Sequence, residues 1–304
     1  TADSKCFAPP GRYLLQRAAD RILRRPGEIR RFNALVVRRA EAFAPAIVLV
    51  IFGRHLAAAT LRQIRERTRA TLIAYATDNP LLPGRSRAHV LESIPEYDIY
   101  ASPRRSSLAS LRAQGCRNPV HLRFGYDAAV HFPERAAEPN GWASDVVFIG
   151  GADDDRVTML TPLASSGRAN VKLYGRGWSR TSLKAHHEGE VFDQHFRLAM
   201  SGARVAPCLV RRSNHDGHVM RSFEIPACGQ FMLAERTEEH QELFEEGVHA
   251  AYFDSAEELH DKTIYYLERD AERERMARAC HQLIAGGQHT YRDRLAELLA
   301  VADA

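Results

Sequence analysis

Apolar residues follow two patterns along the chain: short unbroken runs, and longer stretches in which they recur at helical spacing. Unbroken runs of this kind are typical of strands that are buried on both faces of a parallel sheet. They predict strands at residues 46–52, 70–76, 97–101, 119–122, 145–149, 171–174, 205–209, 231–234 and 250–253. The helical spacing predicts helices at residues 12–25, 27–43, 56–67, 104–114, 156–165, 192–201, 219–228, 237–244, 255–267, 271–284 and 291–301.

Strands and helices alternate in two blocks, on either side of a segment that lacks either pattern. Residues 127–143 are rich in Pro, Glu, Asn and Ala, and we interpret them as a linker. The alternation predicts an α/β fold of two Rossmann-like, doubly wound domains facing each other across a cleft, in residues 1–135 and 144–288. Ligands of such sheets bind beyond the carboxyl ends of the strands, so residues that follow a strand are the candidates for function.

Composition and charge narrow the class of protein. The 304 residues are 45% apolar and 26% charged, and no apolar run is long enough to span a membrane. The formal charge of +4 is spread along the chain, which argues against a dedicated nucleic-acid-binding protein. No signal peptide is present, and five widely spaced cysteines without a CxxC pair indicate reduced, mostly buried thiols and a cytoplasmic location. The cysteines are Cys6, Cys116, Cys208, Cys228 and Cys280.

Several strong motifs are missing. The chain has no GxGxxG for a nicotinamide cofactor, no GxxxxGK[ST] for a phosphate-binding loop, no GxSxG nucleophile turn and no HExxH metal pair. Function must therefore be inferred from weaker signals at the predicted strand ends.

The most informative segment is residues 214–235, which predicts a polar loop, a helix that ends at Gly229, and a strand. A helix start with a preceding polar loop favours an anion, because unpaired backbone N–H groups point there. Arg221 in the first turn could donate two parallel hydrogen bonds to phosphate, and Glu224 could accept from ribose hydroxyls. Asp216 places a second carboxylate in the loop. The alternative is a surface loop with an ordinary helix cap.

A second set of candidates follows the strand at 145–149. Gly150 and Gly151 indicate close approach of the backbone to a phosphate or nucleotide, or simply a tight turn. Asp153 and Asp155 have the spacing of a metal-binding Asp-x-Asp pair, but we interpret them as a polar loop and a negatively charged helix start. We therefore predict no metal site.

Two further strand ends carry candidates. Gly175 and Trp178, after the strand at 171–174, indicate either stacking of an aromatic ring on a base or a loop that packs its tryptophan. Asp78, after the strand at 70–76, is a candidate general base, and a turn before Pro80 is the alternative. His55, after the first strand, is a second candidate base or an ordinary helix-start residue.

The motifs, taken in order, resemble a known family. VVFIGG, LYGRGW, DGHVMRSFEIPACGQFMLAE, FEEGVHAAYFDSAEEL and HTYRDRL are similar to the C-terminal half of the CgeB-like, or spore maturation protein, glycosyltransferases of the GT-B superfamily. The resemblance covers about residues 145–299. It is looser in the first half, in VLVIFG, TLIAYATDNP and CRNPVHLRFGYDAAVHFP.

The resemblance implies a role for each half. In GT-B enzymes the second domain binds the nucleotide sugar, the first binds the acceptor, and no bound metal is needed. It implies that Glu224 holds the ribose, that Arg221 and Arg156 lie near the pyrophosphate, and that Asp216 replaces a sugar-contacting glutamate. It also implies that Gly175 and Trp178 lie near the base and that the final helix, in residues 289–304, crosses back to the first domain. The family's opening strand and Gly-rich turn do not appear in this sequence, so they are either absent from the protein or lost before Thr1.

The predicted function is transfer of a hexose-like sugar from a nucleoside diphosphate sugar to an acceptor hydroxyl or amine. No cofactor beyond the donor is expected. If the configuration is inverted, a base is required, with Asp78 as first candidate and His55 as second; retention needs none. The alternatives are a non-catalytic nucleotide-sugar-binding protein and a sugar-nucleotide epimerase of the same fold.

Overall fold

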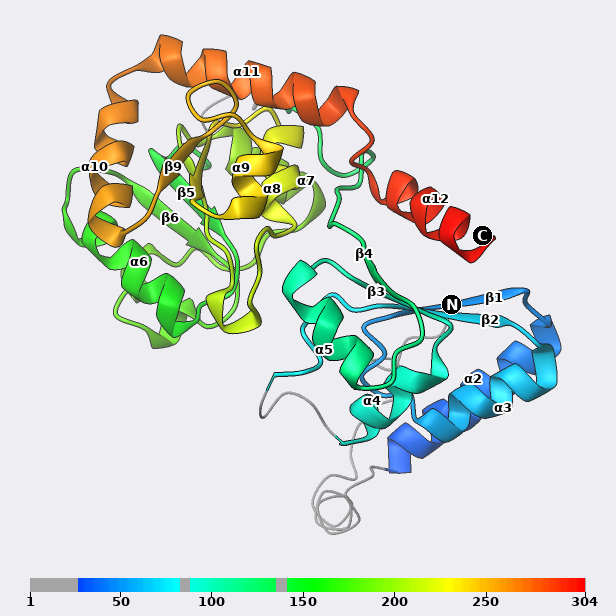
Figure 1. The fold of residues 1–304 in the computed structure, drawn as a ribbon. Helices are drawn as coiled ribbons and strands as arrows, with labels where there is room; N and C mark the ends of the chain where they lie inside the picture. The colour runs from blue at the N-terminus through cyan, green and yellow to red at the C-terminus, as the bar shows by residue number, and fades with distance from the viewer. Residues whose placement is uncertain (1–26, 83–87, 135–140, 304) are drawn as a thin grey trace. The chain divides into compact units, whose positions relative to one another are not determined.

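The computed structural model describes residues 27–82, 88–134 and 141–303 (Figure 1). The predicted helix at 12–25 lies outside these residues, as does Cys6. The chain divides into two compact units: unit 1 comprises residues 1–123 and 300–304, and unit 2 comprises residues 124–299. The division, between residues 123 and 124, falls just before the predicted linker at 127–143. The domain boundaries inferred from the sequence, and the cleft between the domains, remain predictions.

Unit 1 is built on a four-stranded parallel sheet with the strands in sequence order. Its strands are β1 (Ile47–Ile51), β2 (Thr71–Tyr75), β3 (Ile99–Ser102) and β4 (Pro119–His121). Its helices are α2 (Gly27–Phe43), α3 (Ala58–Thr68), α4 (Ala88–Ser93) and α5 (Leu108–Ala113), with 3₁₀ turns η2 (Ile94–Glu96) and η3 (Arg105–Ser107). The strands and α2, α3 and α5 confirm the predicted pattern, whereas α4 was not predicted because its six residues are too few to show a helical period.

The prediction that the first strand is buried on both faces is wrong. β1 and β4 are the two edge strands of the sheet among the described residues. Val50 is buried, but the side chains around it are open, with Leu49 39% and Ile51 63% exposed. An apolar run indicates that a strand belongs to a sheet, while its burial depends on strand order and on the elements that cover it.

Unit 2 carries five parallel strands in two hydrogen-bonded groups, β5–β6 and β7–β8–β9. A parallel bridge between Val146 and Val205 joins the groups. The strands are β5 (Val146–Ile149), β6 (Val171–Tyr174), β7 (Ala206–Cys208), β8 (Met232–Glu235) and β9 (Ala251–Phe253). Around them lie α6 (Asp154–Ser165), α7 (Asp193–Ser201), α8 (Arg221–Ala227), α9 (Glu238–Leu243), α10 (Ala256–Leu267) and α11 (Asp270–Gly286), with 3₁₀ turns η4 (Trp178–Arg180), η5 (Lys184–His186) and η6 (Arg212–Asn214). The last helix, α12 (Tyr291–Ala302), begins in unit 2 and ends in unit 1.

The helices of unit 2 cover both faces of its sheet, as the alternation predicted. α6 packs with α10, and α8 packs with α11, on opposite sides of the strands (Figure 1). Val146, Phe148 and Leu173 from the strands and Leu160 from α6 form the centre of one apolar core. This packing fixes the carboxyl ends of β5 and β6 against the start of α6.

The start of α12 is fixed within unit 2 to residues 124–127. The N–H of Tyr126 donates to the carbonyl of His289 at 3.2 Å, and the N–H of Tyr291 donates to the carbonyl of Tyr126 at 2.9 Å. A Cβ on Gly125 would lie 2.7 Å from the His289 carbonyl oxygen, so the two segments can approach only with glycine there. None of the helices within residues 27–82, 88–134 and 141–303 is long and apolar enough to cross a membrane.

Candidate functional site

The turn at Gly150 and Gly151 is held against the end of β6. The N–H of Gly150 donates to the Tyr174 carbonyl at 2.8 Å, and the indole Nε1 of Trp178 donates to the Gly150 carbonyl at 2.7 Å. A Cβ on Gly175, whose φ is 130°, would lie 2.4 Å from the Gly150 oxygen. Gly175 is therefore required for the two strand ends to approach each other.

Trp178 does not offer a ring face for stacking on a base. Its side chain is 0% exposed and packs edge-on against Phe148, with the ring centroids 5.8 Å apart. The stacking interpretation is therefore corrected: Trp178 packs in the core of unit 2 and fixes the position of the Gly150 carbonyl.

Two arginines flank this turn from different helices. Arg156, in the first turn of α6, donates from Nη1 to the Gly151 carbonyl at 2.9 Å. Arg221, the first residue of α8, donates from Nε to the Ile149 carbonyl at 2.8 Å. The guanidinium of Arg221 also lies over the ring of Phe196, 4.7 Å from its centroid. The carboxyl end of β5 therefore has one positive charge on each side.

Both guanidinium groups are partly removed from water. Burial lowers the pKa of Arg156, with the nearby charge of Arg211 adding to the effect. Burial also lowers the pKa of Arg221 to about 10, and Arg156 contributes in the same direction. Both side chains remain charged at neutral pH. Two repelling cations in a partly desolvated site favour an anion that bridges them.

Glu224 lies one helical turn from Arg221 and forms an ion pair with it through Oε2. Glu224 is 6% exposed. Its Oε1 lies 3.6 Å from Nε2 of His131, a residue that sequence reasoning did not identify. Burial lowers the pKa of His131, with Arg221 adding to the effect, so that its imidazole is neutral at pH 7. The spacing of Arg221 and Glu224 predicted their proximity, whereas His131 comes from a distant segment that carried no such signal.

The acidic residues near this turn serve the local structure. Asp153 caps α6, since its Oδ1 accepts from the N–H of Arg156 at 3.0 Å, and its Oδ2 lies 3.8 Å from Nε of Arg211. Asp155 is exposed in the first turn of the same helix. Asp216 accepts from the Asn214 amide at 3.2 Å. In the part of the chain that the structure describes, no cluster of three or more His, Cys, Asp or Glu side chains could hold a metal ion.

The loop before α8 is more enclosed than its polar sequence indicates. Asn214 and His218 are each only 1% exposed. His218 hydrogen-bonds through Nδ1 to Glu239 of α9, and its Nε2 accepts from the N–H of Phe124 at 3.0 Å. The hydroxyl of Thr237 donates to the Gly217 carbonyl at 2.5 Å. These contacts fix the loop to α9 and to the start of unit 2.

Beneath the loop lies a hydrogen-bonded chain with a buried centre, which sequence reasoning also missed. The hydroxyl of Ser222 lies 2.7 Å from Nε2 of His240, and Nδ1 of His240 lies 2.7 Å from the Glu235 carbonyl. The carboxylate of Glu235 accepts from the N–H of Val210 at 3.0 Å and from Nε of Arg212 at 2.6 Å. Ser222 and His240 are each 0% exposed, so their role is to support the loop.

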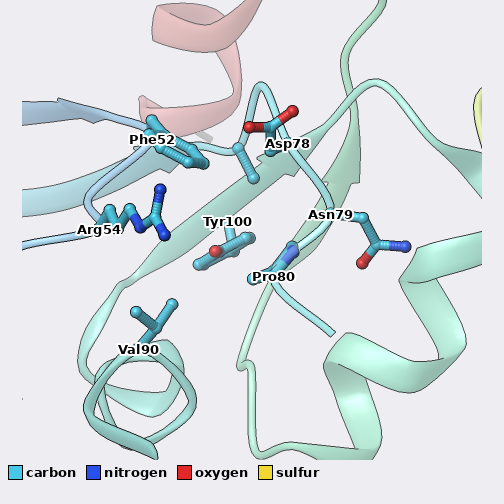
Figure 2. Close-up of a pocket in the computed structure, with 8 residues that line it drawn as sticks. Phe52, Arg54, Asp78, Asn79, Pro80, Val90 and Tyr100 are labelled. Atoms are coloured by element: carbon cyan, nitrogen blue, oxygen red, sulfur yellow. The ribbon is translucent and has the colours of Figure 1, made fainter. Parts of the chain in front are cut away.

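The predicted catalytic residues lie in unit 1. Asp78 lines a cavity of about 180 Å³ at the carboxyl ends of β1 and β2, together with Phe52, Arg54 and Tyr100 (Figure 2). His55 is not among the cavity-lining residues. The side chain of Asn79 points away from the cavity, and its Oδ1 accepts from the N–H of Leu81 at 3.0 Å. A turn of the kind foreseen as the alternative for Asp78 is thus formed by its neighbour Asn79, and Asp78 lines the cavity.

Comparison with known proteins shows which family and which solved structures this chain is similar to. Residues 156–300 match the family described as glycosyl transferase-like. No curated protein matches the sequence significantly. Among solved structures, Anabaena HepE in complex with UDP-glucose is similar, with a TM-score of 0.64, 12% identity, and coverage of 90% of this chain and 82% of that chain.

Two further solved structures share the fold. Sucrose-phosphate synthase from Thermosynechococcus elongatus has a TM-score of 0.67 at 11% identity, covering 91% of this chain and 77% of that one. The UDP-forming α,α-trehalose-phosphate synthase from Burkholderia xenovorans has a TM-score of 0.63 at 13% identity, covering 95% and 79%. At these identities the likeness establishes the fold. With the family match, residues 156–300 form a glycosyl transferase-like domain in a chain whose fold is that of GT-B glycosyltransferases.

Proposed function

We propose that the protein transfers a sugar from a UDP-sugar to a hydroxyl or amine of its acceptor, without a bound metal ion or other cofactor. The observation that carries this proposal is the pair of guanidinium groups, Arg156 and Arg221, on either side of residues 149–151. HepE is similar to this chain and was solved with UDP-glucose, which supports uridine as the base.

The donor-binding residues of unit 2 have separate roles in the proposal. Arg156 and Arg221 bind the diphosphate and stabilise the charge that develops on it as the glycosidic bond breaks. Fixed cations in a partly desolvated site do this without the cost of reorientation. Glu224 accepts from the ribose hydroxyls through Oε1, the oxygen not engaged by Arg221. Asp216 is proposed to contact the sugar, and Gly150, Gly151 and Gly175 provide the close backbone approach.

The acceptor is proposed to bind in unit 1. Asp78 is the first candidate for a base that removes the acceptor proton, because it lines a cavity at the strand ends. His55 is the second candidate. Assignment to the CgeB-like branch is part of the same proposal and is supported by the motifs along residues 145–299. The four described cysteines are buried and free, which supports the cytoplasmic location expected from their spacing.

The test is a thermal-shift titration with UDP, GDP and dTDP. UDP is expected to raise the melting temperature, since ligand bound only by the folded state stabilises it. Glu224→Ala is expected to remove most of the shift, and Glu224→Gln to retain part of it. Glu257→Ala, an exposed position on α10, is the matched control and should leave the shift unchanged.

Turnover separates the proposal from its alternatives. A screen of UDP-sugars should show slow hydrolysis of one of them, and faster release of UDP when an acceptor is present. Binding without turnover on any acceptor would favour a non-catalytic binding protein, and isomerisation without an acceptor would favour an epimerase. The absence of a thermal shift with every nucleotide would reject the proposal.

A further inference from the structure

The cavity of unit 1 is lined by aromatic and other apolar side chains together with polar groups in nearly equal measure. The rings of Phe52 and Tyr100, with Pro80 and Val90, surround it (Figure 2). Tyr100 is 5% exposed and rests edge-on against Tyr97, so its position is fixed. Ligand sites with apolar walls and few polar groups bind the body of the ligand through the walls and orient it through the polar groups.

The backbone at the cavity rim is unusual. Phe52 has φ 64° and Gly53 has φ 52°, so that two successive residues adopt the left-handed conformation. A bulky aromatic residue rarely does so, and such conformations gather at ligand sites. The turn is fixed by a hydrogen bond from the N–H of Phe52 to the Tyr75 carbonyl at 2.8 Å. Its effect is to bring the Phe52 ring and the Arg54 side chain to the same cavity.

Arg54 supplies a positive charge there. In Figure 2 its guanidinium lies beside Phe52 and Tyr100 and points toward the cavity. Among residues 27–82, 88–134 and 141–303, no side chain forms a hydrogen bond or ion pair with this guanidinium. A planar guanidinium donates two parallel hydrogen bonds to a carboxylate or a phosphate and does so best beside apolar surface.

Size limits the ligand to one ring. The cavity volume is about 180 Å³. An apolar cavity of roughly 150 Å³ holds one benzene molecule. The space therefore suits a six-membered ring with one small anionic group, and excludes an oligosaccharide or a peptide from the cavity itself.

We propose that this cavity binds a small aromatic anion, with its ring between Phe52 and Tyr100 and its carboxylate or phosphate on Arg54. The Asp78 carboxylate lies at the rim, where it would meet a hydroxyl on the same ring. The role of such a molecule as the sugar acceptor rests on the proposed function. Its binding in this cavity is independent of that function.

The test uses isothermal titration calorimetry of the full chain without nucleotide. The probes are 4-hydroxybenzoate, 4-hydroxyphenyl phosphate, the neutral 4-hydroxybenzamide and glucose 6-phosphate. Either aromatic anion is expected to bind at least tenfold more tightly than the amide, and the tighter of the two identifies the anionic group. Arg54→Gln is expected to abolish that difference. Arg117→Gln, exposed elsewhere on unit 1, should preserve it. A cooperative thermal unfolding transition like that of the parent chain shows that each variant is folded.

Three outcomes would overturn the proposal: equal binding of the benzoate and the benzamide, tighter binding of glucose 6-phosphate than of both aromatic anions, or no binding of any probe. Failure of the proposed function is distinguished by UDP. If the aromatic anion binds and UDP does not, the cavity assignment stands and the donor assignment fails. If UDP binds and no aromatic anion does, the donor assignment stands alone.

Discussion

The carboxyl ends of the strands carry different arrangements of charge in the two units. In unit 2 they carry arginine side chains already paired with carboxylates, and in unit 1 they surround a cavity into which a guanidinium points (Figure 2). The pairs of unit 2 are Arg221–Glu224, Arg212–Glu235 at 2.6 Å and Arg156–Asp153 at 3.6 Å. The same parallel α/β arrangement thus provides a preset charged site in one unit and an open cavity in the other.

The difference agrees with the chemistry proposed for each unit. Stabilising a departing diphosphate requires charges that are fixed before the reaction, because reorientation would add to the barrier. Accepting a substrate requires space and a group that can orient it. The following predictions test whether the arginine–carboxylate pairs of unit 2 are required for function. They also test whether the buried contacts beneath these pairs hold them in position.

The largest effect is expected for Arg221→Met. The variant removes the hydrogen bond to the Ile149 carbonyl and one of the two cations beside Gly150. We expect a loss of about 10³ in transfer rate, the magnitude found when a fixed donor to developing negative charge is removed. The measurement is the rate of UDP release with saturating donor.

Arg221→Lys and Arg176→Met are the controls for this prediction. Lysine keeps the charge but cannot span both the Ile149 carbonyl and Glu224, so an intermediate loss is expected. Arg176 pairs with Glu190 at 3.0 Å but has an 85% exposed side chain, and its loss should have little effect. Equal losses in Arg221→Met and Arg176→Met would show that general charge, and not the site, determines the rate.

The next effect concerns the buried support of the loop before α8. Burial lowers the pKa of His240 to about 4, from an ordinary value of about 6.5. As pH falls through 6.5, the His240 imidazole becomes protonated in the unfolded chain. In the folded protein it becomes protonated only near pH 4. The free energy of unfolding therefore falls across this range, by on the order of 3 kcal/mol from this residue.

Urea unfolding at pH 7, 6, 5 and 4 measures that slope, and His240→Gln is the comparison. The variant is less stable at pH 7, because Ser222 and the Glu235 carbonyl lose their partner. Its free energy of unfolding should nevertheless depend less on pH than that of the parent chain. Identical slopes would mean that other groups cause the pH dependence.

The sequence predicts the local parts of this molecule better than the distant contacts. α2 is predicted with its observed bounds, since helical spacing continues from Gly27 to Phe43. Arg221 and Glu224 are predicted as neighbours because positions i and i+3 lie on one face of a helix. His131 and Glu235 are missed because their contacts depend on how separate segments pack. The exposure of β1 is missed for the same reason, because an apolar run does not indicate where its strand lies in the order of the sheet.

A smaller effect compares the glycine turns of the two units. Gly175→Ala places a Cβ 2.4 Å from the Gly150 carbonyl oxygen, which belongs to a backbone held by several hydrogen bonds. Gly53→Ala places a Cβ 3.0 Å from the Tyr97 hydroxyl, at a φ of 52° that alanine tolerates better than 130°. We expect Gly175→Ala to cost about 2 kcal/mol more than Gly53→Ala.

Thermal and urea unfolding of both variants measure the difference, and Gly167→Ala is the reference. Gly167 has φ 67° and no atom within 4 Å of the added Cβ, so it isolates the conformational cost. The loss in free energy of unfolding caused by Gly53→Ala should be close to that caused by Gly167→Ala. If Gly175→Ala also does, the approach of the β6 end to Gly150 is less tight than the structure indicates.

The smallest effect is expected for Trp178→Phe, which removes the indole N–H from the buried Gly150 carbonyl. Loss of that hydrogen bond should lower the free energy of unfolding by about 1–2 kcal/mol. Trp142→Phe is the matched control, because the half-buried Trp142 ring stacks on His195 at 5.4 Å and its replacement should lower the free energy of unfolding less.

Because Trp178 is fully buried, its replacement should change UDP affinity only through the position of Gly150, and only within a few fold. Trp178→Leu should change UDP affinity similarly, at a greater cost in stability. Loss of UDP binding in Trp178→Leu but not in Trp178→Phe would instead restore the stacking role, because only the aromatic replacement retains a ring.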